Sequence, residues 1–84
     1  MSCKETIAEI NPKAYLLPEE YDSALIGYVS HMNVPAIAVY EAEKVIEILQ
    51  EELSYEEASE HFEFNIAGSY LGKNTPLFLR KGIL

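Results

Sequence analysis

ALIGYVSHMNVPAIAVYEAEKVIEILQEEL, residues 24–53, decides the fold that the sequence predicts. It opens with two short runs rich in β-branched and aliphatic residues, 24–29 and 36–40, which a brief polar joint separates. Such a pair predicts an antiparallel β-hairpin. The remainder, 41–53, has apolar residues at steps of three and four, which is typical of one face of an amphipathic helix. These residues are Ala42, Val45, Ile46, Leu49 and Leu53.

A second helix is expected directly after the first. Ser54 and Glu57 have the spacing of a capping box, in which each side chain binds the backbone amide of the other residue. Gly68 stands where a left-handed residue ends many helices. Phe64 is expected to cover the hairpin or the N-terminal segment, because it lies off the predicted buried stripe. That stripe consists of Tyr55, Ala58, Phe62 and Ile66.

The complete order of elements predicts one small α+β domain. A turn over 72–76 leads into a last strand over 77–79, so residues 21–84 read as β-β-α-α-β. This order predicts a three-stranded sheet with two helices packed on one face and the other face open. Residues 1–20 are weakly patterned and are expected to form an irregular N-terminal arm, which docks through the apolar patch 14–17.

Negative charge is concentrated in the two predicted helices. The chain has 14 acidic and 6 basic residues, a formal net charge of −8, and nine of the acids fall within 41–63. Because nucleic-acid binding depends on Lys and Arg neutralising phosphates, we expect no direct binding to DNA or RNA. The carboxylates form either a solvated helical face or a surface for a basic protein partner. The candidate partner-binding residues are Glu47, Glu51, Glu56, Glu60 and Glu63.

Residues that carry metal or catalytic chemistry are sparse. Glu57 and His61 lie one helical turn apart, but a structural zinc site needs four ligands and His31 is the only other histidine. The sequence has no nucleophile elbow and no phosphate-binding loop, so we expect a non-enzymatic protein without metal or cofactor. The single cysteine, Cys3, fits a reducing compartment, and no apolar run approaches the ~20 residues of a membrane span. We therefore expect a cytoplasmic protein with no membrane partner.

A second candidate site surrounds the turn that follows the second helix. Asn65, Tyr70 and Thr75 carry polar groups close to Gly68 and Gly72. An asparagine near a helix end can brace the following loop through side-chain to backbone hydrogen bonds. Alternatively, these three side chains form a surface for a ligand or partner. Both interpretations stay open.

Three segments resemble a family of small uncharacterised proteins that is frequent in bacteriophage genomes and prophages. They are DSALIGYV, VPAIAVYEAEKVIEIL and SYEEASEHFEFNIAGSYLGKNTPLFL, and together they span residues 22–79. The most specific motif is F-x-F-N-I-x-G followed by G-x-x-T-P. This chain departs from the pattern at His61, where Tyr or Phe is expected, and in the short link between its helices. The resemblance implies viral or prophage origin and a host cytoplasm, and it implies no catalytic residues.

Three functions fit these observations. The first is a protein-binding module or inhibitor, whose acidic helical face occupies a basic surface on a host or phage protein. The second is a structural or accessory homo-oligomer, such as a homodimer joined through the open sheet face or an edge strand. The third is a small-molecule-binding protein or minor hydrolase at His61, Asn65 and Tyr70.

Overall fold

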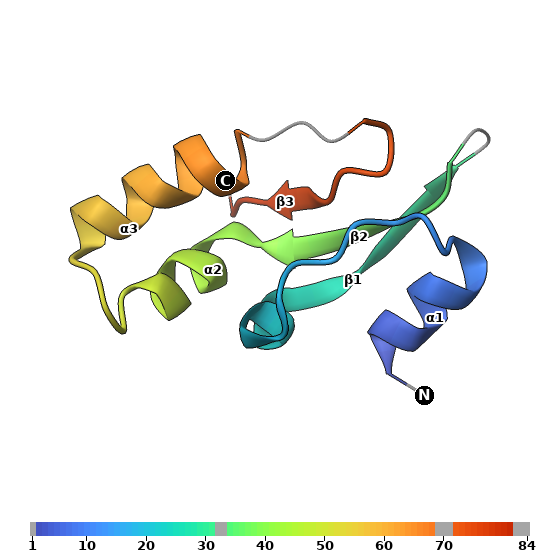
Figure 1. The fold of residues 1–84 in the computed structure, drawn as a ribbon, viewed down its shortest axis with the longest axis horizontal. Helices are drawn as coiled ribbons and strands as arrows, with labels where there is room; N and C mark the ends of the chain where they lie inside the picture. Colours follow the sequence, from blue (N-terminus) through green and yellow to red (C-terminus); the bar gives the residue numbers. More distant parts are fainter. Residues whose placement is uncertain (1, 32–33, 69–71, 82–84) are drawn as a thin grey trace.

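The computed structural model describes residues 2–31, 34–68 and 72–81. The elements in chain order are α1 (Cys3–Ile10), the 3-10 helix η1 (Glu19–Ala24), β1 (Leu25–His31), β2 (Val34–Glu41), α2 (Ala42–Leu49), α3 (Tyr55–His61), the π-helical segment η2 (Phe62–Ile66) and β3 (Leu77–Leu79) (Figure 1). The three strands form a single sheet, and the predicted α+β class is confirmed.

The sheet is mixed and has the order β1-β2-β3. β1 and β2 form the predicted antiparallel hairpin, in which Leu25 lies opposite Tyr40. β3 pairs with β2 in parallel, and Phe78 lies opposite the same Tyr40. Parallel neighbours need a crossover connection, and here α2, α3 and η2 supply it. Tyr40 therefore stands in the middle of the sheet with a strand on each side.

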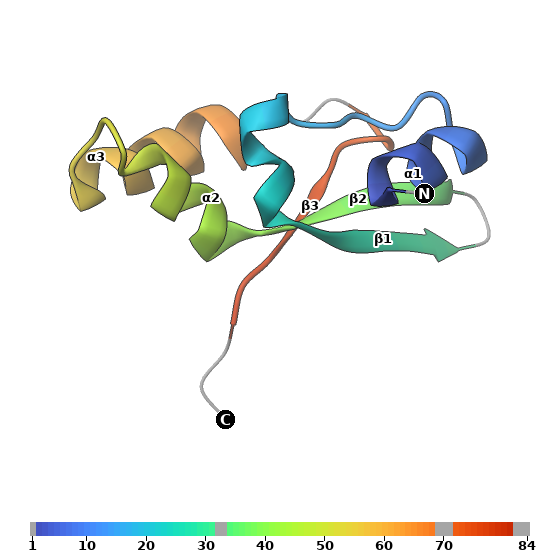
Figure 2. The same ribbon diagram turned by 90° about the horizontal axis from the view of Figure 1, so that it is seen from below.

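α1 and η1 lie on one side of the β1–β2 hairpin (Figure 2). α1 lies over β1 and β2, whereas the predicted helix pair α2–α3 lies beyond the end of β2 (Figures 1 and 2). The strand register places three half-exposed apolar side chains on the opposite face of the sheet: Val29, Leu77 and Leu79. No helix of the described chain covers that face.

The prediction of an irregular arm over residues 1–20 is wrong, because Cys3–Ile10 is helical. Ser2 caps this helix by accepting a hydrogen bond from the Glu5 amide at 3.2 Å. The side chain of Ile7 is fully buried and belongs to the main core. This helix buries little apolar surface, so the apolar periodicity of its sequence is weak. The spacing of Ser2 and Glu5, however, matches the helix-capping motif S-x-x-E. The apolar patch 14–17 does dock, since Leu16 and Leu17 pack against the core.

Asn11 ties three parts of the chain together directly after α1. Its side chain is buried, with 6% exposed. The Asn11 amide nitrogen donates to the carbonyl of Ala36 in β2 at 2.8 Å and to the Asn74 side-chain oxygen at 3.0 Å. The Asn11 side-chain oxygen accepts from the Lys13 amide at 3.2 Å. The N-terminal segment, the central strand and the 72–75 turn thus share one buried polar group.

Three aromatic rings fix β3 and the end of α3 against the sheet. Phe78 stacks on Tyr40 with ring centroids 6.1 Å apart and meets Phe62 edge-on at 5.1 Å. Tyr40 and Phe62 are fully buried. The guanidinium of Arg80 lies 5.3 Å from the centroid of the Phe62 ring, within cation–π range.

The start of α3 follows the prediction and its end does not. Ser54 and Glu57 form the capping box, with both hydrogen bonds at 3.2 Å. The helix then widens into the π-helical η2, where the Ala67 amide bonds to the Phe62 carbonyl at 2.7 Å. Widening changes the helical phase, so Phe64 is 78% exposed instead of covering the hairpin or the N-terminal segment.

Gly68 is not the left-handed residue that the sequence predicts, because among the described residues only Gly72 has a positive φ, 88°. Gly68 instead permits a close approach, since a Cβ there would lie 2.6 Å from the Glu63 carbonyl oxygen. Tyr55 also differs from prediction. It opens α3 with 64% of its surface exposed, outside the buried stripe.

Asn11→Ala should lower the free energy of unfolding by about 2 kcal/mol, because it leaves the buried Ala36 carbonyl without this partner and frees the 72–75 turn. Urea denaturation of the purified protein measures the loss. Gln50→Ala, at an exposed position after α2, is the matched control. Equal stabilities for the two variants would contradict the bracing role of Asn11.

Tyr40→Phe should cost about 1–2 kcal/mol, since the Leu17 amide donates to the Tyr40 hydroxyl at 2.9 Å. Burial raises the pKa of Tyr40 above its ordinary value of 10.0. The folded state therefore favours the neutral phenol. The stabilisation that Tyr40 gives to the folded state is complete below pH 10 and is lost as the pH rises through the raised pKa of Tyr40 in the folded protein. The stability gap between wild type and Tyr40→Phe should narrow above about pH 10. Tyr55→Phe is the control. A stability difference between wild type and Tyr40→Phe that stays constant above pH 10 would contradict a raised pKa of Tyr40.

Candidate functional site

An apolar pocket of about 360 Å³ lies between three segments that are distant in the sequence. The segment before η1 forms one wall, the end of α3 with η2 forms the second, and the start of β3 forms the third. Its apolar lining includes Tyr15, Leu17, Pro18, Ile66, Pro76 and Phe78. The volume falls in the usual range for ligand pockets.

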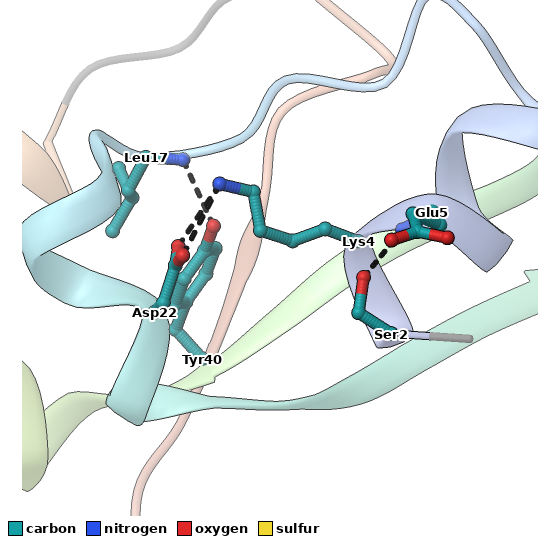
Figure 3. Close-up of polar contacts among 6 residues, drawn as sticks. All are labelled: Ser2, Lys4, Glu5, Leu17, Asp22 and Tyr40. Atoms are coloured by element: carbon teal, nitrogen blue, oxygen red, sulfur yellow. Dashed lines mark hydrogen bonds and ion pairs between the residues drawn. The ribbon is translucent and has the colours of Figure 1, made fainter.

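Backbone hydrogen bonds hold the first wall in place. The Tyr15 amide donates to the Asn74 carbonyl at 3.1 Å, and the Leu17 amide donates to the Tyr40 hydroxyl (Figure 3). The neighbouring η1 is tied to α1 by an ion pair between Lys4 and Asp22, 3.1 Å between Nζ and Oδ1 (Figure 3). The pocket wall is therefore attached to the central strand, to the 72–75 turn and, through η1, to α1.

His61, Asn65 and Thr75 place polar groups along this pocket. The Asn65 Nδ2 lies 3.4 Å from the His61 Nδ1. The Thr75 hydroxyl donates to the Gly72 carbonyl at 2.6 Å and so braces the turn. The structure thus brings two of the three residues of the second candidate site together with His61. The third, Tyr70, lies outside the described residues.

A second, polar groove of about 490 Å³ adjoins the apolar pocket. The two share Glu20, Tyr21 and His61 as lining residues. Burial raises the pKa of Tyr21, and the nearby Glu20 carboxylate raises it further. The remainder of this groove comes from the end of α2 and the turn after it, including Ile48, Leu49, Glu51 and Glu52.

All five predicted partner-binding glutamates are exposed, but they do not form one equivalent set. Two have cationic partners: Glu47 pairs with Lys44 at 3.5 Å, and Glu63 pairs with Arg80 at 2.6 Å. The hydrogen bond from Arg80 lowers the pKa of Glu63. The others are Glu51, Glu56 and Glu60, none of which takes part in an ion pair within the described chain. Of the five, only Glu51 lines the polar groove.

Sequence reasoning missed the contribution of the N-terminal segment to the site. Tyr15, Leu17 and Tyr21 line the apolar pocket, and the available signal was the apolar patch 14–17 next to Pro18. Within residues 2–31, 34–68 and 72–81, no three His, Cys, Asp or Glu side chains are grouped to hold a metal ion. In the same part of the chain, no helix combines the length and apolar character needed to cross a membrane.

Comparison of the chain with protein-family models, curated proteins and solved structures gives no match. The resemblance to small bacteriophage proteins therefore stays a prediction from the sequence.

Proposed function

We propose that this chain is a non-enzymatic binding protein that uses the exposed carboxylates of α3 and of the turn between α2 and α3 to bind a basic surface on another protein. Its partner is a host or phage protein in the cytoplasm of the host cell. The observation that carries the proposal is that Glu51, Glu56 and Glu60 are exposed and form no ion pair within the described chain. These are carboxylates that an external cation can reach.

Glu56 and Glu60 form no ion pair within the described chain, although Glu56 lies in the first turn of α3, where the helix dipole favours a negative charge. They lie four residues apart on α3, where two like charges cost an isolated helix about 0.2–0.5 kcal/mol. The N-cap of this helix is Ser54, and the Glu57 side chain completes the capping box by accepting from the Ser54 amide. A net charge of −8 attracts a basic partner over a distance and speeds association at low salt. Binding to a basic surface would supply cationic partners for carboxylates that have none within the described chain.

The double variant Glu56→Gln with Glu60→Gln should capture a basic protein from host lysate at least about fivefold less well than wild type, because it removes two charges at the interface. Retention by wild type should also fall as salt increases. The matched control is Glu5→Gln with Glu9→Gln, an exposed pair at the same spacing on α1. Equal capture by wild type and both double variants would reject the acidic surface.

A homo-oligomer is the second candidate function, and the exposed edge of β1 favours it. β1 is an outer strand of the sheet, and residues 25–30 carry no charge. Ile26, Tyr28 and Val29 on this strand are 41–50% exposed. Edge strands of monomeric proteins are commonly protected by charged side chains or proline. An uncharged edge is also where two chains of net charge −8 can approach each other with least repulsion.

Light scattering coupled to size exclusion should show a dimer of the wild type at high protein concentration if β1 mediates self-association. Val29→Lys should give a monomer, because the new charge protects the edge. Ala8→Lys, which adds the same charge at an exposed position on α1, should leave the dimer intact. A wild type that stays monomeric up to its solubility limit excludes this function.

A further inference from the structure

The apolar pocket and the polar groove form a continuous surface of two different characters. Glu20, Tyr21 and His61 line both of them. On one side, Tyr15, Ile66 and Phe78 belong to a mainly apolar lining. On the other side, the polar groove is lined by three carboxylates: Glu20, Glu51 and Glu52. An occupant that lies across the shared wall meets an apolar environment at one end and a negative one at the other.

The negative end is not neutralised within the described chain. None of the described residues that line either hollow is Lys or Arg. The four described ion pairs use Asp22, Glu41, Glu47 and Glu63, so none uses Glu20, Glu51 or Glu52. A cationic group in the groove would complement these carboxylates, and an apolar group beside it would fill the neighbouring pocket.

We propose that this surface binds a peptide segment of the partner in which a large apolar side chain stands next to one or two lysines or arginines. The inference rests on the proposed protein-binding function and names the part of the partner that is recognised. The apolar side chain enters the pocket between Tyr15 and Phe78, and the basic side chains face Glu20, Glu51 and Glu52. A buried apolar anchor surrounded by polar contacts is the usual arrangement of binding hot spots.

A peptide fits this surface better than a small amine. Each hollow has the volume of a complete small-ligand site. One small cation would fill only part of the acidic groove and would leave the apolar pocket in water. A peptide places two kinds of side chain on one backbone and fills both hollows at once.

The test uses a fluorescein-labelled, acetylated and amidated peptide with two lysines followed by leucine and phenylalanine. One control peptide has glutamates in place of the lysines, and another has serines in place of the leucine and phenylalanine. Fluorescence anisotropy with the full chain measures affinity. The parent peptide should bind in a salt-sensitive manner, and each control peptide should bind at least about tenfold more weakly.

Variants of the protein then locate the site. Tyr15→Ala and Glu20→Gln should each weaken binding of the parent peptide about five- to tenfold. Tyr55→Ala and Glu43→Gln change the same residue types at exposed positions outside both hollows and should leave affinity unchanged. Thermal unfolding verifies that each variant is folded. Glu20→Gln alters one exposed carboxylate, so it keeps the test decisive even where Tyr15→Ala lowers stability.

Three results would overturn the inference, and each can be distinguished from a failure of the proposed protein-binding function. Binding that Glu56→Gln with Glu60→Gln weakens, but Tyr15→Ala and Glu20→Gln do not, supports the acidic helix surface and rejects the pocket. Absence of peptide binding, together with salt-sensitive capture of a basic protein, also supports the acidic surface and rejects the pocket. Binding of hexylamine as tight as that of the parent peptide rejects a peptide site and indicates a small-amine site.

Discussion

The buried Tyr40 is the contact on which the arrangement of this chain depends. It lies on the central strand, opposite Leu25 on one neighbour and Phe78 on the other. Its ring stacks on Phe78, while its hydroxyl accepts from the Leu17 amide. Two walls of the apolar pocket, the segment before η1 and the start of β3, are thus attached to the same side chain. The positions of these two walls therefore depend on where Tyr40 stands in the sheet.

The parts of the fold that depend on local signals could be predicted from the sequence. The hairpin, the two helices after it and the capping box at Ser54 each follow from periodicity or from a short motif. α1 was missed because its contribution to the fully buried core is a single residue, Ile7. The π-helical η2 was missed because a change of phase leaves no mark in an apolar repeat, and this displaced Phe64.

The candidate site was only partly predictable, because it is assembled from segments that are distant in the chain. Asn65 and Thr75 stood out as polar residues around a turn, and both line the apolar pocket. The opposite wall contains Tyr15 and Tyr21. The sequence pattern of this segment does not indicate which other part of the chain it packs against. The glutamates could be assigned to exposed positions, but their ion pairs with Lys44 and Arg80 depend on side-chain placement in the folded chain.

Three basic residues form ion pairs between distant segments of the chain, whereas most acidic residues form none within the described residues. Lys4, Arg80 and Lys81 each pair with an acid far away in the sequence, namely Asp22, Glu63 and Glu41. Exposed and partly exposed pairs of this kind contribute about 1 kcal/mol or less each, but they use half of the six basic residues. The excess of carboxylates is therefore left to face solvent or another molecule.

The short parallel strand β3 has a consequence for the order of folding. Val39 pairs with Leu77, so this contact must close a loop that contains both helices of the crossover. Closing a long loop costs entropy before any contact is gained, and such pairings slow folding. The β1–β2 hairpin closes a much shorter loop, so we expect it to form before β3 joins the sheet. Pro76 and Phe78 then reach the pocket last, and a ligand bound there would recognise only molecules whose folding is complete.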